Sequence, residues 1–245
     1  MRFTIFAAGM LAAGAPSSAM AQTPPTIART VVAAAKLPDL GAAPLSFCAI
    51  EVTIPPGATS RIAAPAQGIY YQLVGSTEVS AAGETKNLPP GEAVALAAGR
   101  EVSLKAAGDG PSRALHFLLM PTAALGQPVE TAPAAVAELY RTPASIPDLK
   151  PGGYDLNLTR VTFPPQMSPN PPHHRSGAAL YYVVSGTGAT TVAGVTTAKG
   201  PGSIVYEPSS LVHQWGNPGP EPYTFLAFNI NPAGVPAVVQ EAAPK

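Results

Sequence analysis

The chain has 245 residues, and its 14 Lys and Arg balance its 14 Asp and Glu, so the formal net charge is zero. Without a basic surplus to neutralise phosphates, binding to nucleic acid through bulk electrostatics is excluded. The single Cys excludes a disulfide scaffold and any multi-cysteine zinc or iron–sulfur site. With 30 Pro and 23 Gly the chain cannot be mostly helical, because interior prolines break helices. A turn-rich, all-β globular protein remains.

The first residues have the pattern of a secretory signal peptide, residues 1–21. Arg2 supplies a positive charge, residues 3–15 are apolar, and Ala19-Met20-Ala21 fits the small-x-small cleavage pattern. No later stretch approaches the ~18 apolar residues of a spanning helix. We therefore expect cleavage after Ala21 and a periplasmic or secreted product with no membrane partner. The alternative is a buried N-terminal helix.

The chain also contains an internal duplication. Residues 69–75 (IYYQLVG) match residues 180–186 (LYYVVSG) at an offset of 111. Residues 54–56 match residues 163–165 at an offset of 109, so the second copy has gained two residues between these points. They fall in the segment 166–176, which holds two of the four histidines. Two homologous domains therefore follow one another.

The duplication sets the expected domains at residues 42–129 and 150–240. Short strands separated by Gly and Pro turns fill both, which is typical of a sandwich or barrel. We expect an N-terminal arm at 22–41, and a linker at 130–149 with a short helix over 133–140, where the composition is Ala-rich. The arm and the tail after Asn231 are expected to pack on a neighbouring domain or subunit, or to be partly disordered.

The spacing of apolar residues changes within one strand of each copy. In the second copy the apolar residues Leu156 and Leu158 occupy even-numbered positions, whereas Val161 and Phe163 occupy odd-numbered positions. A change of parity along a strand predicts a β-bulge.

Two motifs lie in the second copy. Residues 172–186 read PHHRSGAALYYVVSG, and residues 202–208 read GSIVYEP and are followed by HQWGN at 213–217. With the duplication, these motifs resemble those of the cupin superfamily. The resemblance covers about residues 42–240 and implies two tandem cupin jelly rolls, which are double-stranded β-helix barrels. It does not fix a function, because this fold hosts dioxygenases, isomerases, lyases and non-catalytic binding proteins.

The resemblance implies a degenerate metal site. A metal-binding cupin offers two His and a Glu from the first motif and one His from the second. Counting back from Gly186 places the Glu position at Ala179, and His213 fills the position in the second motif. The His-x-His pair falls either on Pro172 and His174 or on His173 and Arg175. Because neighbouring residues on a strand face opposite ways, either assignment leaves only one His of that pair in the barrel, unless the two-residue insertion breaks the strand.

His173, His174 and His213 are the candidate metal ligands. Imidazole suits Zn, Fe, Mn or Ni, so a single divalent ion with open positions is one hypothesis. A metal-free pocket, in which the same histidines form hydrogen bonds, is equally compatible with the sequence. In the first copy the offset of 111 puts Val102 opposite His213, so we expect no metal ligands in that domain. Its expected role is structural, either closing the pair of barrels or forming a homodimer interface.

Other polar and aromatic residues of the second copy complete the candidate site. Glu207 and Tyr182 are the candidate catalytic residues, because a carboxylate or a phenol can move a proton. The alternative for Glu207 is an ion pair with Arg175 or Arg160. Arg175, Gln214 and Trp215, the only Trp, are the candidate ligand-binding residues.

The sequence therefore predicts an exported cupin-domain protein that binds a small molecule in the C-terminal barrel, with or without a divalent metal. The alternative is a metal-dependent cupin enzyme of the dioxygenase, isomerase or lyase type. Its substrate would be a small carbohydrate-like or aromatic molecule, which fits aromatic faces next to polar groups.

Overall fold

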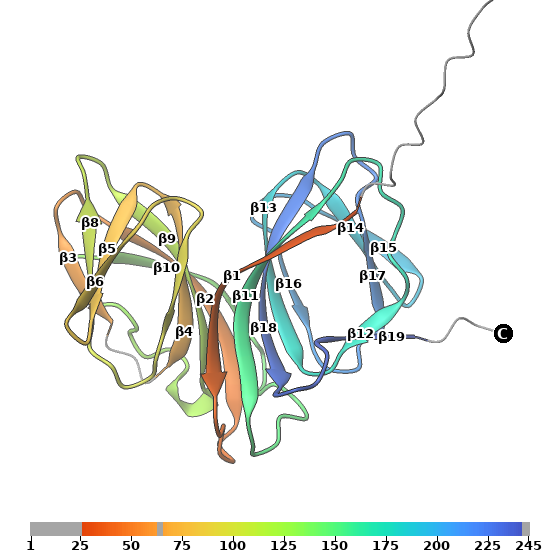
Figure 1. Ribbon diagram of the computed structural model, residues 1–245, viewed down its shortest axis with the longest axis horizontal. Coiled ribbons are helices and arrows are strands. Elements are labelled where there is room, and N and C mark those ends of the chain that lie inside the picture. Colours follow the sequence, from red (N-terminus) through yellow and green to blue (C-terminus); the bar gives the residue numbers. More distant parts are fainter. Residues whose placement is uncertain (1–25, 63–65, 242–245) are drawn as a thin grey trace, which may run out of the picture.

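The computed structural model describes residues 26–62 and 66–241. The signal peptide predicted for residues 1–21 lies outside this range. The described residues form nineteen β-strands and one short 3-10 helix, η1 (Thr122–Ala124), in two barrels that lie side by side (Figure 1). This part of the chain holds no helix long and apolar enough to cross a membrane.

The first copy forms a barrel of two antiparallel sheets. Five strands in the order β10-β2-β9-β4-β7 make one sheet, and four strands in the order β3-β8-β5-β6 make the other. The bounds of these strands are β2 (Leu45–Ile54), β3 (Thr59–Ile62), β4 (Gln67–Val74), β5 (Ser76–Ala81), β6 (Glu84–Leu88), β7 (Ala93–Leu96), β8 (Val102–Ala107), β9 (Ser112–Pro121) and β10 (Ala135–Arg141).

The second copy repeats this arrangement. Its sheets have the orders β1-β11-β18-β13-β16 and β15-β14-β17-β12-β19. Equivalent strands occupy equivalent places in the two barrels, and β19 is an additional strand among the described residues of the second. Each half is therefore an antiparallel jelly-roll barrel, as predicted. The bounds are β1 (Ala28–Leu37), β11 (Tyr154–Phe163), β12 (His173–Arg175), β13 (Ala178–Ser185), β14 (Gly188–Val192), β15 (Val195–Lys199), β16 (Ile204–Glu207), β17 (His213–Gly216), β18 (Tyr223–Pro232) and β19 (Val238–Gln240).

The two barrels exchange their first strands. β1 precedes the first barrel in sequence but pairs with β11 of the second, whereas β10 precedes the second barrel and pairs with β2 of the first. Both pairings slip by one residue at the equivalent point, between Val31 and Ala33 in β1 and between Glu138 and Tyr140 in β10. The segment before each domain therefore completes the sheet of the other domain.

The helix predicted over 133–140 is wrong, because residues 135–141 form strand β10. Ala and Glu favour helices in isolation, but this preference is weak and tertiary contacts override it. Here the open edge of β2 offers a row of backbone donors and acceptors, which β10 satisfies along its length. The side chains of β10 remain mostly exposed, as expected for an edge strand.

The change of parity coincides with an irregularity in the pairing of β11 with β1, which slips between Leu158 and Thr159. The extra residue there is Val32 of β1, however, and β11 itself has no bulge. The register between β11 and β18 is continuous over the whole of β11. Leu156 and Leu158 face an apolar layer between the two barrels, whereas Val161 and Phe163 face the interior of their own barrel. The parity changes because the strand has an apolar layer on each face.

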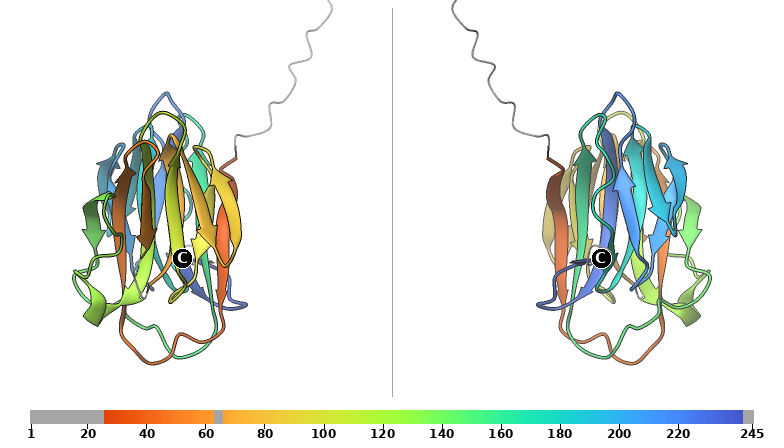
Figure 2. Two further views of the ribbon diagram at one scale, coloured as in Figure 1. Left: turned by 90° about the vertical axis from the view of Figure 1, so that its left-hand side faces the viewer. Right: turned by 90° about the vertical axis from the view of Figure 1, so that its right-hand side faces the viewer.

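This apolar layer between the barrels joins the five-stranded sheets back to back. The ring of Phe228 in β18 lies 5.3 Å from that of Phe47 and 5.6 Å from that of Phe117, both in the first barrel. Figure 2 shows that the strands of the two barrels run in nearly the same direction. The sheet β15-β14-β17-β12-β19 lies on the far side of the second barrel from this layer.

Candidate functional site

Polar side chains gather inside the second barrel because of strand register. His173 of β12 lies opposite His213 of β17, and Ala179 of β13 lies opposite Glu207 of β16. Partners across a ladder point to the same face of a sheet. Tyr181, two residues after Ala179, points the same way and is fully buried.

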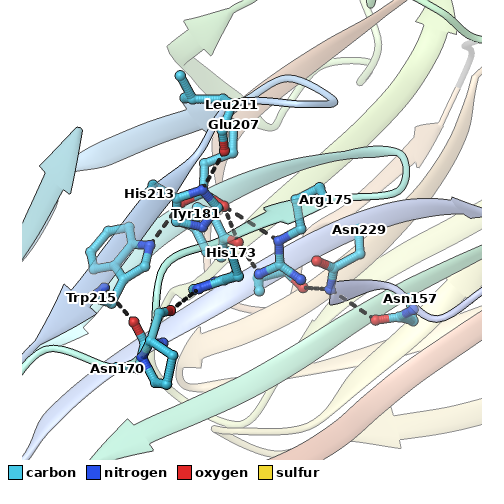
Figure 3. A network of polar contacts seen from close by, with 12 residues as sticks. Asn157, Asn170, His173, Arg175, Tyr181, Glu207, Leu211, His213, Trp215 and Asn229 are labelled. Atoms are coloured by element: carbon cyan, nitrogen blue, oxygen red, sulfur yellow. Dashed lines mark hydrogen bonds and ion pairs between the residues drawn. The ribbon is translucent and has the colours of Figure 1, made fainter. Parts of the chain in front are cut away.

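The carboxylate of Glu207 is the centre of a hydrogen-bond network (Figure 3). Trp215 Nε1 donates to its Oε1 at 2.7 Å. Its Oε2 accepts from the Tyr181 hydroxyl and from Arg175 Nε at 3.3 Å, and lies 3.0 Å from His213 Nε2. Arg175 also donates to the Tyr181 hydroxyl through Nη2. Four side chains from three strands therefore hold one carboxylate.

The network contains a buried ion pair. The side chains of Arg175 and Glu207 are 12% and 2% exposed. Burial by itself raises the pKa of Glu207, but His213 and Arg175 outweigh it and the pKa lies below its ordinary value. Burial likewise disfavours the Arg175 cation, but Tyr181 and Glu207 raise the pKa of Arg175 overall. Both groups are therefore charged at neutral pH, and their charges cancel.

The two imidazoles beside this pair are held in orientation by backbone carbonyl groups. His173 Nδ1–H donates to the carbonyl oxygen of Pro171 at 2.9 Å, and His213 Nδ1–H donates to that of Leu211 at 2.8 Å. Their ring centroids lie 4.3 Å apart. Burial, with further contributions from His213 and Arg175, lowers the pKa of His173. His173 is therefore neutral at pH 7, and its Nε2 can accept a hydrogen bond.

A cavity of about 350 Å³ opens beside the network. Its wall is formed by β11, β12, β17 and β18, together with the exchanged strand β1 and the C-terminal strand β19. Apolar side chains cover one part of the wall, and two cations and several carboxamides cover another. The polar lining side chains that concern the chemistry are Arg29, Arg175, His173, Asn157, Asn170, Asn229 and Gln240.

Five of the residues predicted from the sequence meet at this place: His173, Arg175, Glu207, His213 and Trp215. His173, Arg175 and Trp215 line the cavity, whereas Glu207 and His213 lie behind them. Of the two assignments left open for the His-x-His pair, the structure shows the one that uses His173 and Arg175.

Three predicted residues lie elsewhere, because neighbouring residues on a strand face opposite ways. His174 points out of the barrel, where its Nδ1 lies 2.6 Å from Glu241 Oε1. Tyr182 packs against the apolar layer between the barrels. Gln214 Nε2 donates to the backbone carbonyl of Asn170 at 2.8 Å and does not line the cavity. None of the three belongs to the network around Glu207.

Sequence reasoning missed the contributions of Arg29, Asn157 and Asn229. Asn157 and Asn229 sit on the inward faces of β11 and β18, and their alternation with Leu156 and Phe228 could have indicated this. For Arg29 the sequence held no signal, because its place depends on the exchange of β1 between the domains.

The first barrel has apolar residues at the same places. Ile62 lies opposite Val102 in the first barrel, just as His173 lies opposite His213 in the second. Leu96 occupies the place of Glu207, and with Ile62 and Val102 it belongs to a continuous apolar core. Within the described residues the first barrel therefore has no counterpart of His173, Glu207 or His213 at these places. It buries a different polar pair, His116 with Glu130 at 2.8 Å.

Comparisons with known proteins agree with this architecture. A family model described as "Cupin domain" matches residues 159–229. Oxalate decarboxylase from Lactobacillus farciminis is similar in structure, with a TM-score of 0.56, 15% identity and coverage of 80% of this chain and 79% of that chain. Salicylate 1,2-dioxygenase from Pseudaminobacter salicylatoxidans has a TM-score of 0.54, 12% identity and coverage of 77% and 73%.

AerE from Microcystis aeruginosa also has a TM-score of 0.54, with 15% identity and coverage of 74% of this chain and 86% of that chain. No curated protein matches this sequence. The tandem barrels and their shared strand order define the fold. The chain has the fold of a two-domain cupin, and residues 159–229 of its second copy match the cupin domain model.

The residues at the centre of the second barrel do not fit the metal site that this superfamily implies. Arg175, a cation, stands at a histidine position of the motif, and Ala179 stands at the glutamate position. Both oxygens of Glu207 already accept hydrogen bonds from protein donors. Within the described residues, no three His, Cys, Asp or Glu side chains are arranged to hold a metal ion.

Proposed function

We propose that the second barrel binds a small organic molecule in its cavity and that it does so without a metal ion. The observation that carries this proposal is the ion pair of Arg175 with Glu207, next to a cavity of about 350 Å³. A guanidinium has no lone pair with which to coordinate a metal ion, and here it also engages the carboxylate that could otherwise bind one.

The size and lining of the cavity support a small ligand. Its volume lies near the lower end of the range of small-molecule sites, which are mostly apolar with a few fixed polar groups. Val161, Phe163 and Phe225 supply apolar surface, and Trp215 supplies an aromatic face. This lining favours a compact organic molecule with an apolar body.

Hydrogen bonds fix the polar groups in advance. Trp215 is held by Glu207, and His173 is held by the carbonyl of Pro171. The free Nε2 of His173 then offers an acceptor to a hydroxyl or amine of the ligand. Groups fixed before binding lose little conformational entropy when a ligand arrives, which strengthens binding.

The position of Trp215 gives a direct test. It is the only Trp of the chain and lines the cavity, so its fluorescence reports on a ligand there. Neutral and charged compounds of about 6–15 non-hydrogen atoms, a size suited to this class of site, are titrated into the metal-free protein. We expect saturable quenching by a subset, together with a rise in the melting temperature.

Ala237→Phe fills the cavity, because Ala237 lines it just before β19. Ala233→Phe is the matched control on the same segment, at an exposed position outside the cavity. Loss of quenching in the Ala237 variant alone supports the proposal. Saturable binding that survives Ala237→Phe, or binding that requires added metal, contradicts it.

We also propose that the protein is exported, on the pattern of residues 1–21. Expression of the full chain, followed by N-terminal sequencing of the protein outside the cytoplasm, tests this. The expected first residue is Gln22. Recovery of the uncleaved chain from the cytoplasm alone contradicts export.

A further inference from the structure

The cavity holds a positive charge that the network around Glu207 does not use. Arg29 lies in β1 opposite Val161 of β11, and both residues line the cavity. Arg29 is an exposed residue at the mouth of the cavity. Among the described residues, no ion pair joins Arg29 to a carboxylate. The exchanged strand therefore brings a cation to the barrel of the other domain.

The charge balance of the cavity is positive. Arg175 is compensated by Glu207, whereas Arg29 is not. No Asp or Glu lines the cavity, and the remaining polar lining groups are carboxamides, a threonine hydroxyl and a neutral imidazole. Burial, with repulsion from Arg175, lowers the pKa of Arg29. An anion near both guanidinium groups would relieve this repulsion.

Asn229 adds a buried acceptor with a fixed direction. Its Nδ2 donates to Asn157 Oδ1 and to the backbone carbonyl of Ala227, both at 2.9 Å. A carbonyl can only accept, so the amide nitrogen must face Ala227 and the orientation of the side chain is determined. Its Oδ1 is buried and has no partner, in a residue that is 4% exposed and lines the cavity beside Arg175 (Figure 3). A buried acceptor without a donor is costly.

We propose, on the basis of the small-molecule binding proposed above, that the ligand is a small carboxylic acid whose carboxylate is bound by Arg29 at the mouth of the cavity. Its apolar body lies against Phe163 and Phe225. A hydroxyl or amine on that body donates to Asn229 Oδ1. Arg29 thus determines specificity from the first strand of the chain, although the cavity belongs to the second barrel.

The test compares acids with their uncharged isosteres. Benzoate, phenylacetate and 2-naphthoate are each titrated against the corresponding carboxamide, with Trp215 fluorescence as the readout. We expect at least one acid to bind about two- to fivefold more tightly than its amide, the effect of one exposed charge contact. Arg29→Gln should remove this preference without weakening the binding of the amide, and Arg29→Lys should retain part of it.

Two further variants test whether the effect on acid binding comes from charge inside the cavity. Lys36→Gln removes a positive charge from the other end of β1, where Lys36 pairs with Asp155 outside the cavity. This variant should leave the preference for acids over amides unchanged. Asn170→Asp adds a negative charge to the wall. It keeps the Oδ1 acceptor that holds Trp215 N–H at 2.8 Å, and it should weaken the acids alone.

The outcomes separate the two proposals. An acid preference that Arg29→Gln abolishes supports the assignment of Arg29. Equal binding of acids and amides, or a preference that survives Arg29→Gln, overturns the assignment and leaves small-molecule binding intact. If none of the acids binds, the carboxylate class is overturned, and binding of neutral compounds then decides the proposed function by itself.

Discussion

Ala179 and Glu207 lie directly opposite one another on the paired strands β13 and β16, inside the second barrel. The cupin motif would place a carboxylate on β13, at Ala179, whereas this chain presents one from the neighbouring strand. The carboxylate is therefore present in the barrel, but its partner is the guanidinium of Arg175.

The ion pair between Glu207 and Arg175 should contribute strongly to stability. Glu207→Gln leaves a buried cation without its counter-charge, and we expect a loss of about 3–5 kcal/mol in the free energy of unfolding. In the double variant with Arg175→Met, the loss should be smaller than the sum of the single losses, because neither charge remains unpaired. Urea denaturation of the four proteins measures this coupling.

Glu138→Gln is the matched control, because Glu138 pairs with Arg141 on the surface of β10. An exposed pair of this kind is worth about 1 kcal/mol or less. Equal losses for Glu207→Gln and Glu138→Gln would contradict the importance assigned to the buried pair.

The metal content of the protein should be well below one equivalent per chain. Protein purified without a histidine tag is incubated with Zn, Mn, Ni and Fe(II), dialysed, and analysed by mass spectrometry of the elements. The cation of Arg175 and the engaged oxygens of Glu207 are the reason for this expectation. One tightly held equivalent that His213→Ala removes would contradict it.

The converse experiment restores the motif. Arg175→His together with Ala179→Glu places imidazole and carboxylate at the positions that metal-binding cupins use. This variant should gain a stoichiometric divalent metal, with His173 and His213 as further ligands. The double variant Arg175→Met and Ala179→Leu is the control, since it removes the cation without adding a ligand, and it should stay metal-free.

Stability should fall as the pH drops below about 6.5, the ordinary pKa of histidine. The pKa of His173 is lowered in the folded protein, mainly by burial, so the unfolded chain binds this proton more readily. The stabilisation is complete above the unfolded pKa and is lost as the pH falls towards the folded one. Glu207, whose pKa is also depressed, loses its contribution only at more acidic pH, below its ordinary value.

Melting temperatures measured between pH 5 and pH 7.5 test this predicted loss of stability at lower pH. His173→Asn, which can still donate to the carbonyl of Pro171, should flatten the dependence in that range. His174→Asn, on the outer face of the same strand, should retain it. A His173 variant with the dependence of the wild type would show that another group titrates.

Much of the architecture could be predicted from the sequence, because it follows from local patterns. The offset of 111 between the copies anticipated the two like barrels, and the turn residues anticipated their strands. Strand β10 was predicted as a helix because its pairing with β2 is a tertiary contact, which the Ala-rich composition does not reveal. Packing of the N-terminal arm on a neighbouring domain was one of the predicted alternatives, and β1 packs in this way, but its pairing with β11 and the matching exchange of β10 were not predicted.

The candidate site was partly predictable. Motif positions indicated His173 or His174, His213 and Arg175, but only the strand direction shows which histidine faces inward. The pairing of Glu207 with Arg175 was one of two alternatives, since a sequence does not state which cation reaches a buried carboxylate. The roles of Asn229 and Arg29 could not be predicted, because the cavity wall to which they belong forms only when four strands and both terminal segments meet.

The two barrels should unfold together, because they share the apolar layer that contains Phe47, Phe117 and Phe228. Phe228→Ala should cost about 3–5 kcal/mol, as for other buried aromatic residues, and should destabilise both copies. Each barrel holds a unique probe. Trp215 reports on the second barrel, and Cys48, buried in the first, reports through its reaction with a thiol reagent.

Burial raises the pKa of Cys48 to about 11, so the folded protein presents an unreactive thiol and labelling follows unfolding of the first barrel. In urea, the midpoint from Trp215 fluorescence and the midpoint from Cys48 labelling should coincide in the wild type. Both should shift by the same amount in Phe228→Ala. A Trp215 transition that precedes the exposure of Cys48 would show that the second barrel unfolds independently and that the shared layer does not couple the copies.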